Sequence, residues 1–383
     1  MNVAIVVIAH NRPDALRRLL GSIVRAYYPG DDHVPLLISI DGEGPSEVYE
    51  VAREFRWSFG EKTVIAHPAK LGLRDHVLSC GDLVQDYDGI IMLEDDLVAS
   101  PLFYTYGVNA LQTYREESRV GGISLYSYRQ VYGLPFSPSV ANGDVLLIKF
   151  PSSWGQAWTR SQWQGFRCWL RNMGTENRRE LDSQLPGFVA AWPSVSSWKK
   201  EFARYLVDSN TYVVYPRVAL TTNMGDPGYH IEQNSLVHQV PIQVAPMRFR
   251  FAKTSQMVSY DQFFELEHRS LEFLGGARNL SVDIEFDLYG QKPSAWLSDR
   301  YVVSSKIPQI EMQSFGMQLL PHELNVIYGI QGQVFYLGKG GEFSNAIQPA
   351  RLGLLRHQTA FLGIRDRARL LYRGLVEKVR SQL

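Results

Sequence analysis

The segment Gly89-Ile-Ile-Met-Leu-Glu-Asp-Asp96 joins an apolar run directly to three consecutive acidic residues. Apolar residues without alternation are typical of a parallel strand that is covered on both faces. Similar runs occur earlier, at Val3–Ala9 and Leu36–Ile40, and a helical pattern follows each of them. This alternation over the first 125 residues predicts an α/β fold with a doubly wound, mostly parallel sheet and flanking helices.

Polar residues stand directly after three of these predicted strands. The first strand is followed by His10, Asn11 and Arg12, the second by Asp41, and the third by Glu94, Asp95 and Asp96. Ligands of open α/β sheets bind outside the carboxyl ends of the strands. We therefore expect these side chains to meet in one site.

The acidic triplet is the most informative of the three segments. Carboxylates this close raise one another's pKa unless a cation joins them. Their oxygens suit Mg²⁺ or Mn²⁺, which proteins usually hold with one or two carboxylates and the phosphates of a substrate. Such an ion would stabilise a departing nucleoside diphosphate. The alternative is a solvated turn whose Asp residues cap the helix that begins near Pro101.

Composition limits the function further. The 383 residues suffice for two domains, and the 39 basic residues balance the 39 acidic ones, so nothing suggests bulk nucleic-acid binding. Cys80 and Cys168 form neither a disulfide framework nor a metal-ligand spacing. No apolar run approaches the length of a membrane span, and the start is typical of a strand rather than of a signal peptide. We expect a cytoplasmic enzyme.

Three regions differ in pattern. Residues 1–247 carry the α/β pattern, and residues 248–345 predict a smaller β-rich unit, because Ser281–Tyr289 alternates with period two. Residues 346–383 predict a basic amphipathic terminal helix. That helix suits peripheral contact with the inner face of a membrane, or docking on the body of the protein.

Five segments in order carry a resemblance to a known family. They are Ile8–Pro13, Ile38–Gly42, Ile91–Leu97, the Trp154 to Trp158 region, and Tyr215-Pro216 followed by Asn223–Gly225 and His230. Over residues 1–240 they resemble GT-A glycosyltransferases. The resemblance is to the N-acetylglucosaminyltransferase I type, with its Glu-Asp-Asp motif, and to related bacterial polysaccharide enzymes. It implies a GT-A, Rossmann-like fold that binds a nucleotide-sugar donor, commonly UDP-linked, and Mn²⁺ or Mg²⁺.

The resemblance also implies roles for single residues. Asp96 would be the metal ligand, Glu94 and Asp95 would order the site and hold sugar or ribose hydroxyls, and Asp41 would accept a hydrogen bond from the base. The other donor-binding residues would be His10, Asn11, Arg12, Arg74 and His230, although Arg74 also suits a surface helix and a lone His is often structural. Aromatic rings pack on sugars, so the acceptor would contact Trp154, Trp158 and Trp198, unless these rings belong to the core.

One departure concerns the general base. An inverting transferase needs a group that takes the proton of the acceptor hydroxyl. Lys199 stands where the resemblance places an Asp, and lysine at its ordinary pKa is protonated. The remaining candidates for the base are Glu201, which is preferred because it needs the least rearrangement, Asp182 and Asp226. The alternative is that the correspondence with the family is displaced by a residue or two.

The expected function is therefore an inverting, metal-dependent transfer of a hexose or N-acetylhexosamine. The acceptor would be a saccharide or lipid-linked saccharide of a bacterial surface polysaccharide. Two alternatives remain open. A sugar nucleotidyltransferase would use a similar sheet, although His10–Asp14 lacks the glycines of a phosphate loop. Lys199 favours the other alternative, a catalytically impaired protein that only binds its nucleotide-sugar or carbohydrate.

Overall fold

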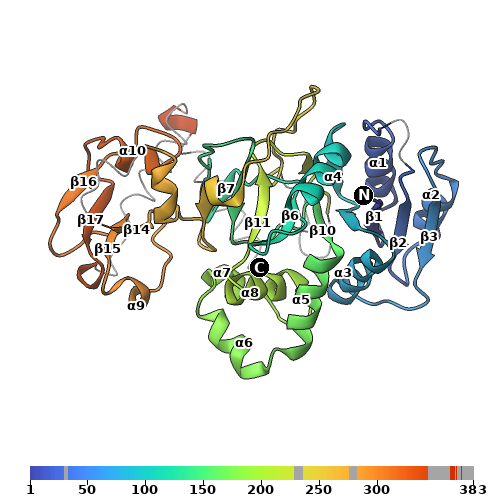
Figure 1. Cartoon of the computed structure of the whole chain (residues 1–383), viewed down its shortest axis with the longest axis horizontal. Helices are drawn as coiled ribbons and strands as arrows, with labels where there is room; N and C mark the ends of the chain where they lie inside the picture. Colours follow the sequence, from blue (N-terminus) through green and yellow to red (C-terminus); the bar gives the residue numbers. More distant parts are fainter. Residues whose placement is uncertain are drawn as a thin grey trace. The chain divides into compact units, whose positions relative to one another are not determined.

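A computed structural model describes residues 1–29, 33–227, 236–275, 283–343 and 363–366, together with residues 368 and 372. The chain divides into two compact units. The first contains Met1–Arg129 and Pro138–Ala277, and the second contains Gln130–Ser137 and Arg278–Leu383. The fold is mixed α/β, with a large sheet in the first unit and a separate smaller sheet in the second (Figure 1).

The large sheet has nine strands in the order β13-β9-β11-β6-β10-β4-β1-β2-β3. The strands are β1 (Val3–Ala9), β2 (Leu36–Ile40), β3 (Lys62–Ala66), β4 (Gly89–Glu94), β6 (Val120–Ser124), β9 (Val145–Ile148), β10 (Gln156–Thr159), β11 (Tyr212–Pro216) and β13 (Ser259–Tyr260). Strands β4, β1, β2 and β3 are parallel, whereas β10 runs antiparallel to both β4 and β6. The predicted strands at the start of the chain are confirmed, and β1 and β2 are fully buried, as their apolar runs require.

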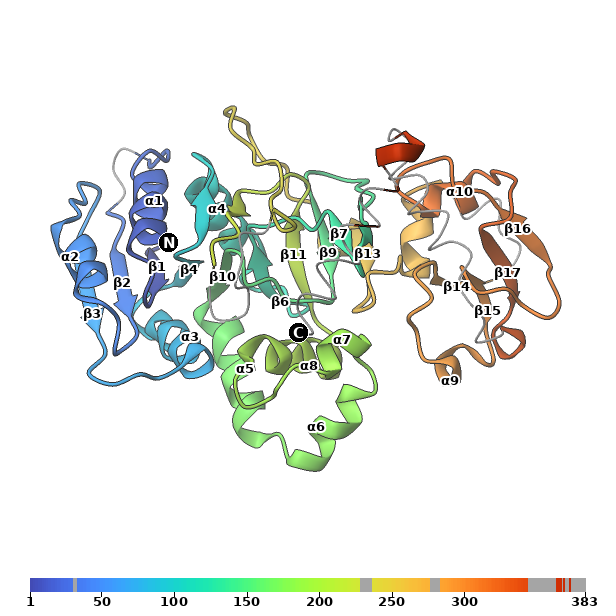
Figure 2. The same cartoon turned by 180° about the vertical axis from the view of Figure 1, so that it is seen from behind.

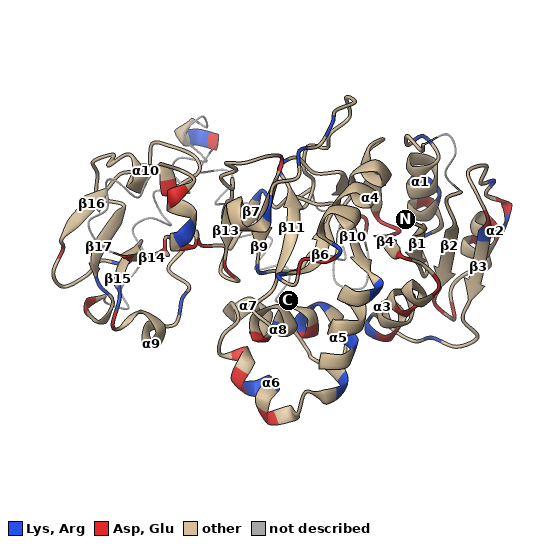
Figure 3. Cartoon of the chain, in the orientation of Figure 1, with Lys and Arg blue, Asp and Glu red and all other residues tan. Residues whose placement is uncertain are grey.

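Helices cover both faces of this sheet, with α1 and α4 on one side and α3, α5 and α8 on the other (Figures 1 and 2). Their bounds are α1 (Pro13–Ile23), α2 (Ser46–Glu54), α3 (Leu73–Asp82), α4 (Phe103–Tyr114), α5 (Arg160–Asn172), α6 (Thr175–Asp182), α7 (Gly187–Ala190) and α8 (Trp198–Asp208). Thr159 starts α5 with a capping box. Its hydroxyl accepts from the Gln162 backbone N–H, and the Gln162 side-chain oxygen accepts from the Thr159 backbone N–H. Charges of both signs mix along α6 (Figure 3).

A cluster of aromatic rings forms the core between β10, α5 and α8. Trp158 lies 4.8 Å from Trp163 and 5.8 Å from Phe202 between ring centroids, and Trp198 lies 6.2 Å from Phe202. Trp158 and Trp198 are only 1% and 2% exposed. Two of the three tryptophans expected to touch the acceptor are thus placed in the core.

A short antiparallel pair fixes the chain beside the acidic triplet. Strand β5 (Leu97–Ala99) pairs with β12 (Thr221–Asn223), with Asn223 opposite Leu97. The backbone N–H of Met224 donates to the carbonyl of Asp96 at 2.9 Å. Residues 126 and 128 positions apart are therefore brought next to each other.

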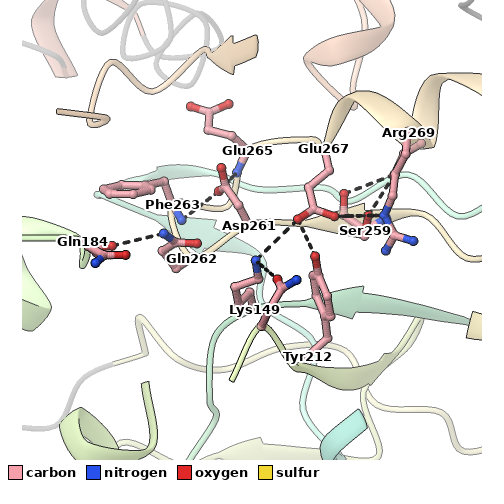
Figure 4. A network of polar contacts seen from close by, with 12 residues as sticks. Lys149, Gln184, Tyr212, Ser259, Asp261, Gln262, Phe263, Glu265, Glu267 and Arg269 are labelled. Carbon is pink, nitrogen blue, oxygen red and sulfur yellow. Dashed lines mark hydrogen bonds and ion pairs between the residues drawn. The ribbon is translucent and has the colours of Figure 1, made fainter. Parts of the chain in front are cut away.

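Residues 248–275 belong to the first unit, although the sequence pattern predicts the start of a second domain at residue 248. Phe249 and Phe251 pack on Tyr106 of α4, with ring centroids 5.1 and 5.7 Å away. Strand β13 then joins the edge of the large sheet beside β9. A polar network around Glu267 connects this segment to β9 and β11 (Figure 4).

The second unit has a four-stranded sheet in the order β14-β15-β17-β16. Its elements are β7 (Gln130–Val131), β8 (Leu134–Pro135), β14 (Ile284–Asp287), α9 (Ser294–Leu297), β15 (Tyr301–Ser304), β16 (Gln313–Phe315), α10 (Glu323–Ile327) and β17 (Phe335–Lys339). Asp287 is fully buried and accepts hydrogen bonds from the backbone of Lys292 and from Ser304. The predicted β-rich unit is thus present, with its boundary near residue 278.

Most of the predicted terminal helix, residues 346–383, lies outside the described residues. Among the residues that are described, no helix combines the length and apolar character needed to cross a bilayer.

Candidate functional site

The three polar segments that follow β1, β2 and β4 meet at one cavity of about 880 Å³ in the first unit. The cavity wall contains seven of the predicted donor-site and metal-site residues: His10, Asn11, Arg12, Asp41, Glu94, Asp95 and Asp96. This follows from the parallel arrangement of the three strands, whose carboxyl ends lie at the same edge of the sheet.

Asp41 anchors the loop that closes one side of the cavity. Its carboxylate accepts hydrogen bonds from the backbone N–H groups of Gly42, Leu71 and Gly72 at 2.9, 2.7 and 3.0 Å. Burial alone would raise the Asp41 pKa, but these bonds and the nearby His76 lower it overall, so the group is ionised. A side chain on Gly42 would lie 2.2 Å from the backbone of Ala69, which explains the glycine at this close approach.

A buried histidine lies beside Asp41 and was not found from the sequence. His76, on α3, is 2% exposed and lines the cavity. Its Nε2 lies 2.8 Å from the hydroxyl of Ser39, which also lies 3.1 Å from Nε2 of His67. Burial lowers the His76 pKa to about 4, so the ring is neutral. The helical pattern of the sequence predicts that His76 lies on a helix, but it does not distinguish a histidine of the site from a residue of the core.

Arg12 supplies the positive charge that the acidic triplet requires. Its guanidinium forms an ion pair with Asp95, and its Nη1 lies 3.1 Å from Oδ2 of Asp96. Burial would lower the pKa of Arg12, but the charges of Asp95 and Asp96 raise it overall. The position of Arg12 after the first strand predicts that it lies in the cavity, but it does not predict the ion pairs with Asp95 and Asp96.

One arginine does not balance three carboxylates. Burial, followed by the charge of Asp96, raises the pKa of Glu94 above its usual range. Burial also raises the pKa of Asp95 to about 6, against the effect of Arg12. Oδ1 of Asp96 is buried without a hydrogen-bond partner among the described residues. The site thus has spare negative charge and an unsatisfied oxygen, which together suit a further cation.

Asp226 is the one base candidate that lines the cavity. It forms a two-point ion pair with Arg18 of α1, with Nη1 3.2 Å from Oδ1. The ion pair holds the segment after β12 against α1.

The opposite wall is built from Trp154 and His238. Their rings pack in a tilted arrangement, with centroids 4.4 Å apart and an angle of 32° between the planes, and both line the cavity. Lys199 lies against Trp154, with its Nζ 4.9 Å from the ring centroid. Burial lowers the Lys199 pKa to about 8, although the charge of Glu94 opposes this shift. The sequence did not single out His238.

The other two base candidates lie away from the cavity wall. Glu201 is 1% exposed and contacts Arg204, with Oε1 2.9 Å from Nη1. Asp182 accepts two hydrogen bonds from the same arginine, at 2.8 and 2.7 Å. Asp182 of α6 is thus held by Arg204 of α8, and Oε1 of Glu201 lies 3.7 Å from Nη1 of Arg178 in α6. These contacts tie α6 to α8, and the placement of both acids does not favour the role of base.

Two further predicted donor residues are not found at the cavity. Arg74 forms an ion pair with its neighbour Asp75 at 2.6 Å and is not part of the cavity wall. His230 lies outside the described residues.

A divalent ion would need ligands from more than the protein. Within the described part of the chain, no three His, Cys, Asp or Glu side chains are arranged to hold a metal. The residues do fit an ion that is shared with a substrate, because Asp96 offers its free Oδ1 beside Glu94. Mg²⁺ is commonly held by one or two carboxylates together with phosphate oxygens.

No protein-family model matches this chain, and no curated protein matches it. Among solved structures, the chain is similar to the mannosyltransferase PcManGT from Pyrobaculum calidifontis in complex with GDP-Man and Mn²⁺. The identity is 14% and the TM-score 0.32, over 42% of this chain and 45% of that one. It is also similar to residues 1–349 of S. aureus TarS in complex with UDP, with 9% identity and a TM-score of 0.36 over 58% and 60%. At these TM-scores the likenesses carry no weight in the functional argument.

Proposed function

We propose that this chain is a metal-dependent glycosyltransferase of the GT-A type. It would move a hexose or N-acetylhexosamine, with inversion, from a UDP-linked donor to a saccharide or lipid-linked saccharide of a bacterial surface polysaccharide. A cytoplasmic location, with peripheral membrane contact through residues 346–383, is part of this proposal.

The observation that carries the proposal is the state of the acidic triplet. Three carboxylates meet one arginine, and Oδ1 of Asp96 remains unpaired in the wall of a cavity that would hold a nucleotide. A divalent ion bound at Asp96 would stabilise the charge of the leaving diphosphate. Asp41, ionised and fixed by three backbone N–H groups, would accept a hydrogen bond from the base.

The test is donor turnover in the presence of Mn²⁺. Purified protein is incubated with a panel of nucleotide-sugars, and the products are identified by chromatography. Release of nucleoside diphosphate without pyrophosphate is expected. Asp96→Asn should reduce turnover by roughly 100-fold or more, because the transition-state charge loses its stabilisation. Asp14→Asn is the matched control, since the side chain of Asp14 is 93% exposed.

Other outcomes would support different functions. Pyrophosphate formation would favour a sugar nucleotidyltransferase. Donor binding without turnover would favour the impaired binding protein, for which the position of Lys199 is the specific argument. Full turnover by Asp96→Asn would contradict the metal assignment.

A further inference from the structure

The proposed transfer needs a proton acceptor, and the acids in the cavity are already engaged. Arg12 contacts Asp95 and Asp96, and Arg18 contacts Asp226. Glu94 lies in the cavity wall beside Asp96, in the triplet that would hold the metal ion. Asp41, the remaining carboxylate of the cavity wall, accepts three backbone N–H groups. A carboxylate base in this cavity would therefore first have to give up an ion pair, its backbone hydrogen bonds or its place beside the metal ion.

His238 lies in the same cavity and is held there by its backbone. Its carbonyl accepts a hydrogen bond from the hydroxyl of Tyr126 at 3.1 Å. Two residues later, the N–H of Val240 donates to Oγ1 of Thr222 at 2.9 Å. Thr222 lies in β12, the strand that pairs beside the triplet. These two bonds fix the backbone at His238 and two residues after it, and its imidazole packs against the Trp154 ring in the cavity wall.

Burial and the charge of Lys199 keep the His238 ring neutral. Burial is the main cause that lowers the His238 pKa below its usual value, and the positive charge of Lys199 lowers it further. The charge of Asp96 opposes both effects but does not reverse them. A neutral imidazole has a free lone pair, which a general base requires.

The other two histidines of the cavity wall lie toward the Asp41 side. His76 is bonded to Ser39, and the charge of His10 acts on His76. His238 responds instead to Lys199 and Asp96. Its ring contact in the cavity wall is with Trp154.

We propose that His238 is the general base of the transfer, which deepens the proposed function and rests on it. The acceptor hydroxyl oxygen forms a bond to the anomeric carbon while its proton passes to an imidazole nitrogen of His238. The bond from the anomeric carbon to the diphosphate breaks, and its electron pair leaves with the nucleoside diphosphate. The imidazolium then returns its proton to solvent, so no other reactant is required.

The test compares His238→Gln and His238→Ala with His33→Gln, a control at an exposed position. Transfer to acceptor is measured beside nucleotide binding by calorimetry. We expect His238→Gln to lose roughly 100-fold to 10,000-fold in transfer rate while it still binds the nucleotide, since general base catalysis contributes that much. Added imidazole should restore part of the transfer in His238→Ala, which a purely structural role would not allow.

Three results would overturn the inference. They are unchanged transfer by His238→Gln, loss of nucleotide binding in proportion to transfer, and no rescue of His238→Ala by imidazole. Each of them leaves the proposed function intact, provided that the wild type turns over a donor. If the wild type turns over no nucleotide-sugar of the panel, the proposed function and the base assignment are contradicted together.

Discussion

Lys199 is a partly buried cation that is surrounded by aromatic rings. Its Nζ lies between 4.9 and 5.9 Å from the ring centroids of Trp154, Trp192, Phe150 and Tyr128, and 3.3 Å from the Tyr128 hydroxyl. The faces of aromatic rings attract cations, which offsets part of the cost of burying this charge. The ammonium thus acts on the cavity by electrostatics, through its effect on His238.

Replacing Lys199 with Met should raise the pKa of His238. The Lys199 charge disfavours the imidazolium, so its loss makes protonation easier, and the acid limb of the transfer rate should move to higher pH. Nuclear magnetic resonance titration of the His238 ring measures the shift directly. Above about pH 8 the wild-type lysine also loses its charge, so the difference between the two proteins should shrink.

Lys199→Arg keeps the positive charge and should leave the titration of His238 close to that of the wild type. If Lys199→Met also leaves this titration unchanged, the electrostatic effect of Lys199 is refuted. Because the readout is a titration, the result holds even if the variant transfers sugar poorly.

The sequence predicts a residue of the site only where that residue directly follows a strand, because the end of the strand then fixes its position. His10, Arg12, Asp41 and Asp96 directly follow apolar runs, so the sheet alone brings them together. His238 stands in an irregular segment, and its contact with Trp154 spans 84 positions of the chain. No periodic pattern of apolar residues in the sequence predicts a contact between residues so far apart. The sequence marks Lys199 as a departure from the family, but its lowered pKa depends on burial that only the packed structure shows.

At the scale of elements, Glu267 attaches the segment with β13 to the large sheet. Its carboxylate accepts hydrogen bonds from Tyr212 at 2.6 Å and from Ser259 at 2.5 Å, and lies 3.8 Å from Nζ of Lys149 (Figure 4). Burial would raise the Glu267 pKa, but these hydrogen bonds and the charges of Lys149 and Arg269 lower it overall. The ionised carboxylate therefore stabilises the folded state.

Glu267→Gln should lower the free energy of unfolding by about 1–3 kcal/mol at pH 7, as measured by urea denaturation. The stabilisation by Glu267 is complete above its ordinary pKa of 4.5 and is lost as the pH falls through the lower pKa of the folded state. The difference between wild type and variant should therefore shrink below pH 4.5. A constant difference over that range would contradict the assignment, and Glu272→Gln, at an exposed position of the same segment, is the control.

The same segment shows why some elements escape prediction. Long apolar runs such as β1 need no partner to be identified, because both of their faces are buried. Strand β13 has only two residues and joins the sheet through its neighbour β9 and the contacts of Glu267. Its place depends on residues more than a hundred positions away, so a change in local pattern near residue 248 predicted a boundary that the packing does not follow.

At the scale of the whole molecule, the cavity belongs to one unit. All of its lining residues, from Ile8 to His238, lie in the first unit, whereas the second unit has its own sheet and buried core. A ligand that binds only the folded first unit stabilises it by about 2.7 kcal/mol at a concentration of 100 Kd.

We therefore predict that UDP with Mn²⁺ slows backbone hydrogen exchange in peptides from β1, β4 and α1, but not in peptides from β14, β15 and β17. Mass spectrometry of the full-length protein can compare the two sets, with Asp96→Asn as the control that should lose the protection. Equal slowing in both units would mean that the second unit takes part in binding the nucleotide, which the composition of the cavity wall does not predict.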